Sequence, residues 1–325
     1  MHYRSPAWLP GGQLQTIWPA LYARRTEGQA LVWQRERWDS PDADFIDVDF
    51  SNEAAPDAKR KPLLVVFHGL EGSSQSHYAQ ALAHWARQHG MACAVPHFRG
   101  CSGEINRAPR AYHSGDFQEI DWILRRMKAR VPERKLVVVG ISLGGNALMR
   151  WAQETGASAS AVASAVASVC SPLDLAAAGH AIGKGFNRQV YTRMFLKTMK
   201  PKALERLALH PKLFDAQALL RSRDLYEFDN IFTAPLHGFK NTEDYWDRAS
   251  AKPRMAEIQI PALALNARND PFMPASSLPK AGQVGKHVTL WQPEQGGHVG
   301  FPAGSFPSDV HAMPRAVGQW LLGHA

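Results

Sequence analysis

The chain has 325 residues, 45% of them hydrophobic and 20% charged, which is ordinary for a globular protein and excludes a mainly disordered chain, a collagen and a coiled coil. Its length favours two domains, or one large α/β domain with an insertion. The net charge is +8, but no basic run is interleaved with aromatic residues, so we expect no nucleic-acid partner and at most weak peripheral contact with an anionic membrane surface or an acidic substrate.

The N-terminal segment and the cysteines indicate the compartment. The opening sequence, MHYRSPAWLPGG, lacks the apolar run of a signal peptide. Three cysteines without CxxC spacing exclude a disulfide framework and a zinc ribbon or knuckle, and they favour a reducing environment. We therefore expect a cytoplasmic location. The charge-free residues 155–173 are rich in Ala and Ser and are predicted to form a helix end, a turn and a buried strand, not a membrane span.

Short apolar runs alternate with helical patterns along the chain. Runs such as LLVVF at 63–67 are apolar throughout, which is typical of strands that helices cover on both faces. Their alternation with helices predicts an α/β fold with a mostly parallel, doubly wound sheet. In chain order we expect a strand at 45–50, a strand at 63–67, a helix at 76–89, a strand at 91–95, a helix at 116–130, a strand at 135–140, a helix at 142–154, strands at 161–169, 261–266 and 287–291, and a helix at 308–322.

One long segment interrupts this alternation. Residues 174–254 are helix-like, basic and aromatic, and they contain no clear buried strand. Since they fall between the fourth and fifth strands of the parallel core, we expect them to form a helical cap or lid over the sheet. The predicted organisation is an α/β core built from residues 1–173 and 255–325, with the cap inserted between its two parts.

The sharpest local signal is the sequence GISLGG at 140–145. A G-x-S-x-G run between a strand and a helix is the nucleophile elbow, in which a strained turn projects the serine hydroxyl from the sheet edge. Small residues are needed two positions before and after the serine, because strand and helix crowd there. An apolar strand pattern precedes the motif and a helical pattern follows it, so Ser142 is the predicted nucleophile.

A serine hydroxyl is a poor nucleophile unless a base takes its proton. In folds that carry a nucleophile elbow, the acid and then the histidine follow the serine along the chain. His298 is the candidate base, because it lies in a glycine-rich loop between the last predicted strand and the last helix. Asp270 follows the strand at 261–266 and is expected to hold one imidazole tautomer. Asp174, after the fourth parallel strand, is the alternative acid. His68 is expected to shape a turn and not to act as the base.

The sequence also predicts an oxyanion hole and excludes several other kinds of site. The N–H groups of Leu143, after the nucleophile, and of Leu70, after the strand at 63–67, are the predicted oxyanion hole. No HExxH, other metal-ligand spacing or phosphate-binding glycine loop occurs, so we expect no metal and no cofactor. Serine at the elbow excludes the aspartate nucleophile of epoxide hydrolases and haloalkane dehalogenases. Cys101 is expected to be a small residue in a tight loop and not a reactive thiol.

Several short motifs outside the elbow are shared with one protein family. They are LQT at 14–16, HGLEG at 68–72, FRGCSGE at 98–104, YHSGD at 112–116, GISLGGN at 140–146, PLDL at 172–175, EFD at 227–229 and APLHGF at 234–239. With the loops around Asp270 and His298, they make the chain resemble the YheT-like α/β hydrolases over nearly its whole length. The family often has His before LQT, where this chain has Gln13, so no catalytic role is given to that motif.

The resemblance implies the α/β-hydrolase fold and an esterase, with eukaryotic relatives that include monoacylglycerol lipase, alcohol acyltransferase and phospholipase activities. It also implies Ser142, Asp270 and His298 as the triad, in agreement with the local patterns. APLHGF is expected to be a packing element that docks the cap. Five aromatic residues of the cap are expected either to line an acyl pocket or to form ordinary core: Phe186, Tyr191, Phe195, Phe228 and Tyr245.

The predicted function is a serine carboxylesterase that cleaves short- to medium-chain acyl esters, small-molecule substrates, through an acyl-enzyme resolved by water. One alternative is an acyltransferase that uses the same triad and passes the acyl group to an alcohol. A second alternative is a binding protein that keeps the fold and has no catalytic activity.

Overall fold

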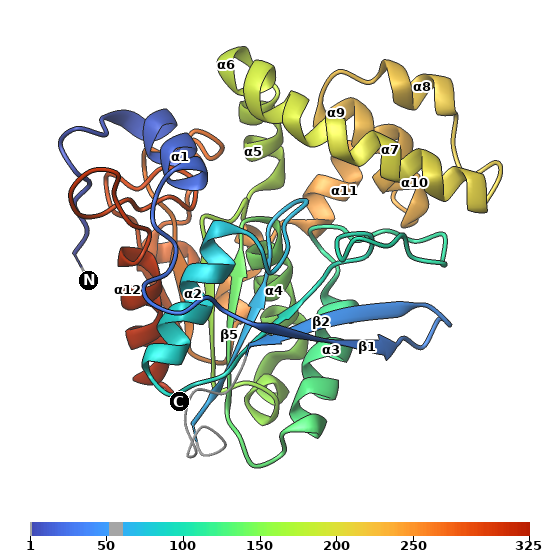
Figure 1. Cartoon of the computed structure of the whole chain (residues 1–325). Coiled ribbons are helices and arrows are strands. Elements are labelled where there is room, and N and C mark those ends of the chain that lie inside the picture. Colours follow the sequence, from blue (N-terminus) through green and yellow to red (C-terminus); the bar gives the residue numbers. More distant parts are fainter. Residues whose placement is uncertain (1, 52–60) are drawn as a thin grey trace.

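The computed structural model describes residues 2–51 and 61–325 (Figure 1). Its strands are β1 (Trp33–Asp39), β2 (Phe45–Ser51), β3 (Leu63–Phe67), β4 (Cys93–Pro96), β5 (Leu136–Ile141), β6 (Ala165–Val169), β7 (Ala262–Leu265) and β8 (Val288–Trp291). They form one sheet in the order β1-β2-β4-β3-β5-β6-β7-β8. β2 pairs antiparallel with β1 and β4, and the other pairs are parallel. The predicted fold class is therefore confirmed.

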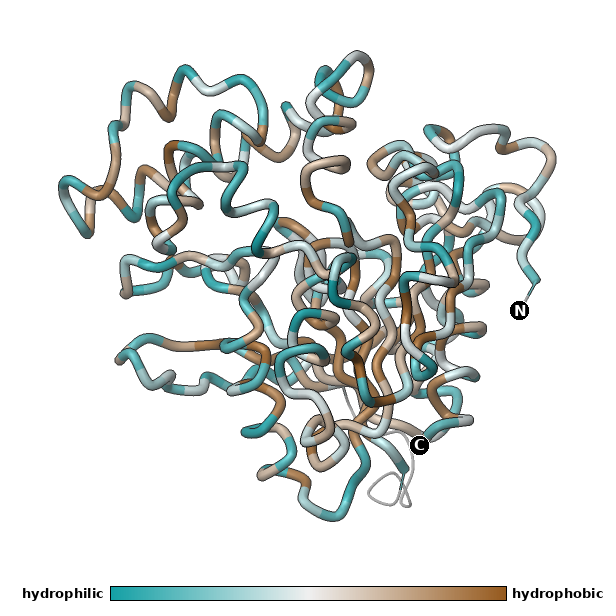
Figure 2. Tube along the Cα trace, turned by 180° about the vertical axis from the view of Figure 1, so that it is seen from behind, coloured by the Kyte–Doolittle hydropathy of each residue, from teal (hydrophilic) through white to brown (hydrophobic). Residues whose placement is uncertain are grey.

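Helices cover both faces of the sheet (Figure 1). The helices of this core are α1 (Gly11–Leu21), α2 (His77–Gln88), α3 (Phe117–Arg130), α4 (Leu143–Thr155) and α12 (Ala312–Leu322). Successive strand residues point to opposite faces, so Val66 packs with α2 and α12 while Val65 packs with α3 and α4. Both side chains are fully buried, which explains why β3 is apolar throughout. Figure 2 shows hydrophobic residues concentrated along these central strands.

All the strands and helices expected above are present, with boundaries that differ by up to four residues. Two further elements, β1 and α1, were not predicted. β1 has the sequence WQRERWD and lies at the sheet edge with mostly exposed side chains, so it lacks the apolar alternation of a half-buried strand. α1 begins with two glycines and contains Pro19, and both residue types disfavour helix.

The segment between β6 and β7 is helical, and Figure 1 shows it gathered over the end of the sheet where β5 runs into α4. Its helices are α5 (Leu175–Ile182), α6 (Gly185–Asn187), α7 (Arg193–Leu209), α8 (Ala216–Arg221), α9 (Leu225–Phe228), α10 (Ala234–Leu236) and α11 (Thr242–Ala249). Leu219, Phe228 and Phe232 form an apolar cluster within it. The insertion thus has a small core of its own above the carboxyl ends of the parallel strands.

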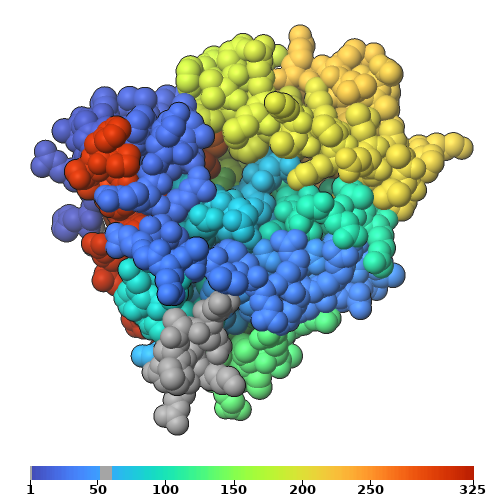
Figure 3. All heavy atoms as spheres, viewed as in Figure 1, coloured from blue at the N-terminus to red at the C-terminus, as the bar shows by residue number. Residues whose placement is uncertain are grey.

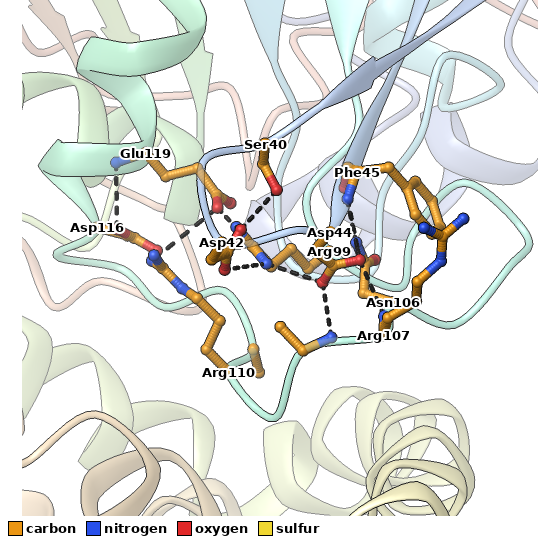
Figure 4. A network of polar contacts seen from close by, with 12 residues as sticks. Ser40, Asp42, Asp44, Phe45, Arg99, Asn106, Arg107, Arg110, Asp116 and Glu119 are labelled. Carbon is orange, nitrogen blue, oxygen red and sulfur yellow. Dashed lines mark hydrogen bonds and ion pairs between the residues drawn. The ribbon is translucent and has the colours of Figure 1, made fainter.

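A buried ionic network holds the FRGCSGE segment in place (Figure 4). The guanidinium of Arg99 lies 2.9 Å from a carboxylate oxygen of Asp44 and 2.6 Å from one of Glu119, and all three side chains are at most 3% exposed. Asp44 precedes β2 and Glu119 lies on α3, so Arg99 ties the loop after β4 to two elements of the core. Burial, with the nearby Asp116 carboxyl, raises the pKa of Glu119 to about 7.

The same network decides how the N-terminus of α3 is capped. Asp116 caps the helix by accepting a hydrogen bond of 3.3 Å from the backbone N–H of Glu119. Glu119 could complete a capping box by bonding back to the N–H of the cap residue, but its side chain turns to Arg99 instead. A charge-assisted bond in a buried site outweighs the reciprocal cap.

Replacing Arg99 by methionine is expected to lower the free energy of unfolding by about 3–5 kcal/mol, because it removes the nearest cation from two buried carboxylates, those of Asp44 and Glu119. Denaturant unfolding followed by circular dichroism measures the change. The matched control is Arg125→Met, which removes a largely exposed ion pair with Asp121 on α3 and should change stability by about 0.5 kcal/mol or less. Equal, small effects in both variants would contradict the structural role given to Arg99.

Candidate active site

Ser142 occupies the tight turn between β5 and α4, with a φ of 51°. A Cβ atom at Gly140 would lie 2.5 Å from the carbonyl oxygen of Gly144, and one at Gly144 would lie 2.4 Å from that of His68. Both positions therefore admit only glycine, and a positive φ at a non-glycine residue is strained. The predicted elbow geometry is present, and the serine stands at the carboxyl end of the central strand.

Three of the predicted site residues lie in one hydrogen-bonded series. The Nε2 atom of His298 is 3.1 Å from Oγ of Ser142, and its Nδ1 atom is 2.9 Å from Oδ2 of Asp270. The Asp270 side chain is fully buried, and its other oxygen accepts a bond of 2.8 Å from the N–H of Phe272. Because an ionised carboxylate only accepts, Nδ1 carries the proton and Nε2 is left to accept from the serine hydroxyl.

The alternative acid lies in a different setting. Asp174 caps α5 by accepting from the N–H of Ala177 at 3.1 Å, and it pairs with Lys252 at 3.2 Å. It has no hydrogen bond to a histidine within residues 2–51 and 61–325. The structure therefore brings Asp270, and not Asp174, to the imidazole of His298.

His68 is fully buried and both of its ring nitrogens are bonded to the backbone. Nε2 accepts from the N–H of Phe98 at 3.0 Å, and Nδ1 donates to the carbonyl of Gly69 at 2.7 Å. Burial lowers the pKa of His68 to about 3, so the ring is neutral. It holds the turn after β3, as the sequence predicted, and takes no part in the series around Ser142.

A cavity of about 130 Å³ opens beside Ser142, between the core and the insertion helices. Leu70 and Leu143 both line it, and the bonding of the described residues leaves their backbone N–H groups without a protein acceptor. Free N–H donors beside a nucleophile are what an oxyanion hole requires. The positions of both leucines are thus compatible with the predicted donors.

The five aromatic residues of the insertion divide between the cavity and other places. Phe195 and Tyr245 line the cavity. Tyr191 is buried and packs edge to face against Phe272, at 4.6 Å between ring centroids, while Phe228 belongs to the core of the insertion. Phe186 is 54% exposed. The sequence alternatives of pocket lining and ordinary core therefore both occur, and for Phe186 neither alternative was right.

The loop that carries Leu70 is fixed by residues of the HGLEG and YHSGD motifs. Glu71 has a φ of 57°, and its N–H donates to the hydroxyl of Tyr112 at 3.0 Å. That hydroxyl in turn donates to a carboxylate oxygen of Glu71 at 2.9 Å, and Lys202 of α7 pairs with the same carboxylate at 2.7 Å. These motifs hold the predicted oxyanion loop and connect it to the insertion.

Helix α1 supports the loops of Asp270 and His298, a role that was missed in the sequence. The side-chain oxygen of Gln15 accepts from the N–H of Gly296 and from the amide of Asn269, both at 2.9 Å. The hydroxyl of Thr16 accepts from the N–H of His298 at 2.8 Å. Figure 3 shows this N-terminal part of the chain beside the C-terminal residues on one flank. The LQT motif was the available signal.

A cysteine and a histidine–carboxylate cluster lie outside the series around Ser142. Burial raises the pKa of Cys101 to about 12, and its N–H closes a tight turn with the carbonyl of Phe98 at 2.9 Å, as expected of a small loop residue. Among the described residues, Glu27, His84 and His311 are grouped with ligand atoms within 4.8 Å of one another. None of the three lines the cavity at Ser142.

Comparisons with known proteins agree with this arrangement. The family described as the alpha/beta hydrolase fold matches residues 62–304. The chain is 38% identical over 310 residues to YheT of Escherichia coli (strain K12), covering 95% of this chain and 89% of that protein. It is 24% identical over 323 residues to Phospholipase ABHD3 of Homo sapiens, covering 94% and 78% respectively.

Solved structures show the same fold. The esterase Pf2001 of Pyrococcus furiosus matches with a TM-score of 0.55 and 14% identity, over 93% of this chain and 99% of that chain. A structural match at 14% identity shows the fold alone. The relatives found by sequence also show the type of enzyme. The chain belongs to the α/β-hydrolase fold family, as a relative of YheT, and it is a hydrolase with esterase- and lipase-type homologues.

Proposed function

We propose that the protein is a serine carboxylesterase for short- to medium-chain acyl esters, with Ser142, His298 and Asp270 as its catalytic triad. The observation that carries the proposal is the hydrogen-bonded series of these three side chains beside the cavity. Ser142 attacks the ester carbonyl carbon while its proton passes to Nε2 of His298. The imidazolium then protonates the departing alcohol, and water attacks the acyl-enzyme by the reverse proton path.

The oxyanion that forms at each tetrahedral stage needs donors that are already in place. We assign this role to the backbone N–H groups of Leu70 and Leu143, whose lack of a protein acceptor among the described residues leaves them available. Asp270 keeps its negative charge and stabilises the imidazolium, because its buried oxygens accept bonds from His298 and Phe272.

The insertion helices act in this proposal as a cap that closes the acyl site. Residues 174–254 supply much of the cavity wall, including Leu175, Ile182, Phe195 and Leu225. The lining is mainly apolar, and the volume of about 130 Å³ is below the ~300–1,000 Å³ typical of sites for drug-sized ligands. A small apolar cavity favours short or medium acyl chains over long ones.

A series of p-nitrophenyl esters of increasing chain length tests the function. We expect steady turnover with an optimum at short or medium chains. Stoichiometric release of nitrophenol that becomes continuous only when an alcohol is added would favour the acyltransferase, since the acyl-enzyme would then reject water. If no nitrophenol is released and a fluorophosphonate does not label the protein, the result would favour the alternative of a binding protein without catalytic activity.

Weak peripheral membrane contact also stays a prediction. Across the described residues no helix is both long and apolar enough to cross a bilayer. Trp8, Tyr22 and Phe306 are 38%, 59% and 69% exposed, and they cluster around Trp18. Aromatic side chains of this kind are typical of membrane interfaces. We expect co-sedimentation with anionic vesicles at low salt that falls in Trp8→Ser and at high salt, whereas binding unchanged by both would contradict an interfacial contact.

A further inference from the structure

The cavity beside Ser142 contains a carboxylate that the proposed mechanism does not use. Asp229 lines it from the insertion, and it is the acidic residue among the described residues that form the wall. Leu225 lies four residues before Asp229 and Thr233 four residues after it, and both line the same cavity. This spacing places the three side chains on one side of the helical segment that begins with α9. Residues Asp229–Thr233 form a π-helical turn, a local irregularity that is frequent at functional sites.

Neutral donors hold the carboxyl of Asp229. Its Oδ2 atom accepts from the indole N–H of Trp246 at 2.9 Å, and the hydroxyl of Thr233 also bonds to it. No Lys or Arg pairs with it in the part of the chain that the structure describes. Burial raises the pKa of Asp229 to about 6. A carboxylate has about four acceptor positions, so the Asp229 side chain can accept a further bond from a donor that enters the cavity it lines.

The carboxyl of Asp229 is half-buried and has no cation, which costs stability, and the bond from the indole N–H of Trp246 offsets only part of that cost. A neutral amide such as Asn could accept the same bond from Trp246 without placing a charge in a wall formed by side chains such as Leu225 and Phe195. The group therefore makes sense as a ligand for something that enters the cavity. A substrate ammonium would lose its hydration among apolar side chains at high cost, whereas a hydroxyl loses much less and can donate to the carboxyl.

We propose that Asp229 is a specificity-determining residue that binds a hydroxyl group of the ester substrate, so that the preferred substrates are hydroxylated esters. The inference rests on the proposed esterase function. The hydroxyl belongs either to the acyl chain or to the alcohol portion, and the chemistry of recognition is the same for both. A site built to bind a hydroxyl discriminates against the analogue that lacks it, because the carboxyl is then left without its partner.

Two substrate pairs separate these sources. p-Nitrophenyl 3-hydroxybutyrate against p-nitrophenyl butyrate varies the acyl chain, and glycerol monobutyrate against propyl butyrate varies the alcohol. We expect kcat/KM to favour the hydroxylated member of one pair by about 10- to 100-fold, as a bond to a charged group allows. Asp229→Leu should remove that preference, and Asp229→Asn, which retains an acceptor for Trp246, should reduce it.

The matched control is Glu205→Gln, an exposed acidic residue of α7, in which the preference should persist. Binding is also measured without turnover, as the thermal shift that each butyrate ester gives in Ser142→Ala with and without Asp229→Leu. If no ester is hydrolysed, the proposed function fails and the thermal shifts still test Asp229. Equal handling of both members in both pairs, or a preference that survives Asp229→Leu in a folded variant, would overturn the inference.

Discussion

Ser142→Ala is expected to lower kcat for p-nitrophenyl butyrate by at least about three orders of magnitude and to abolish labelling by a fluorophosphonate. The substitution removes the attacking oxygen while the glycines that shape the elbow and the lining of the cavity remain. Residual rate would come from binding and from the donors of Leu70 and Leu143, which act on any carbonyl held there. Steady-state absorbance assays and fluorescence gels measure the two effects.

The control for this experiment is Ser158→Ala, at an exposed serine after α4 whose hydroxyl bonds to the carbonyl of Thr155. Its turnover and labelling should match those of the parent chain. Labelling that persists in Ser142→Ala would show that another group is the nucleophile, and the assignment of the series around His298 would then be wrong.

Asp270→Asn is expected to lower kcat by about 10⁴-fold, because the amide no longer holds the proton on Nδ1 of His298 and cannot stabilise the imidazolium. Asp174→Asn is the matched variant: asparagine also caps helices well, so α5 should persist and activity should stay near that of the parent. Rates measured across the ester series compare the two. Loss of activity in Asp174→Asn with none in Asp270→Asn would reverse the choice of acid.

Local sequence patterns predicted the central strands and helices. A strand that is buried on both faces consists of consecutive apolar residues, and such a run is easily recognised in the sequence. β1 and α1 escaped prediction for the opposite reason. The residues of β1 are mostly polar because the strand lies at the edge of the sheet, and α1 is stabilised by tertiary contacts that overcome its glycines and proline.

At the candidate site the same distinction holds. Ser142, Asp270 and His298 each follow a recognisable strand, so their proximity was predictable from topology, since parallel strands bring their carboxyl ends to one edge. The LQT motif singles out Gln15 and Thr16, but it does not indicate that they bond to loops more than 250 residues away. Nothing in the local sequence around Asp229 indicates that it faces a cavity, because only the packing of the insertion against the core creates that surface.

The attachment of the His298 loop to α1 has a consequence for how activity responds to stress. Helix α1 lies outside the central sheet and includes exposed side chains such as Leu14 and Leu21, so its local opening is expected to require less free energy than unfolding of the sheet. Once α1 detaches, the N–H of His298 loses the hydroxyl of Thr16, and the imidazole is no longer held at the serine. On heating, catalysis would then disappear before the secondary structure does, and it would return on cooling as long as the sheet had stayed intact.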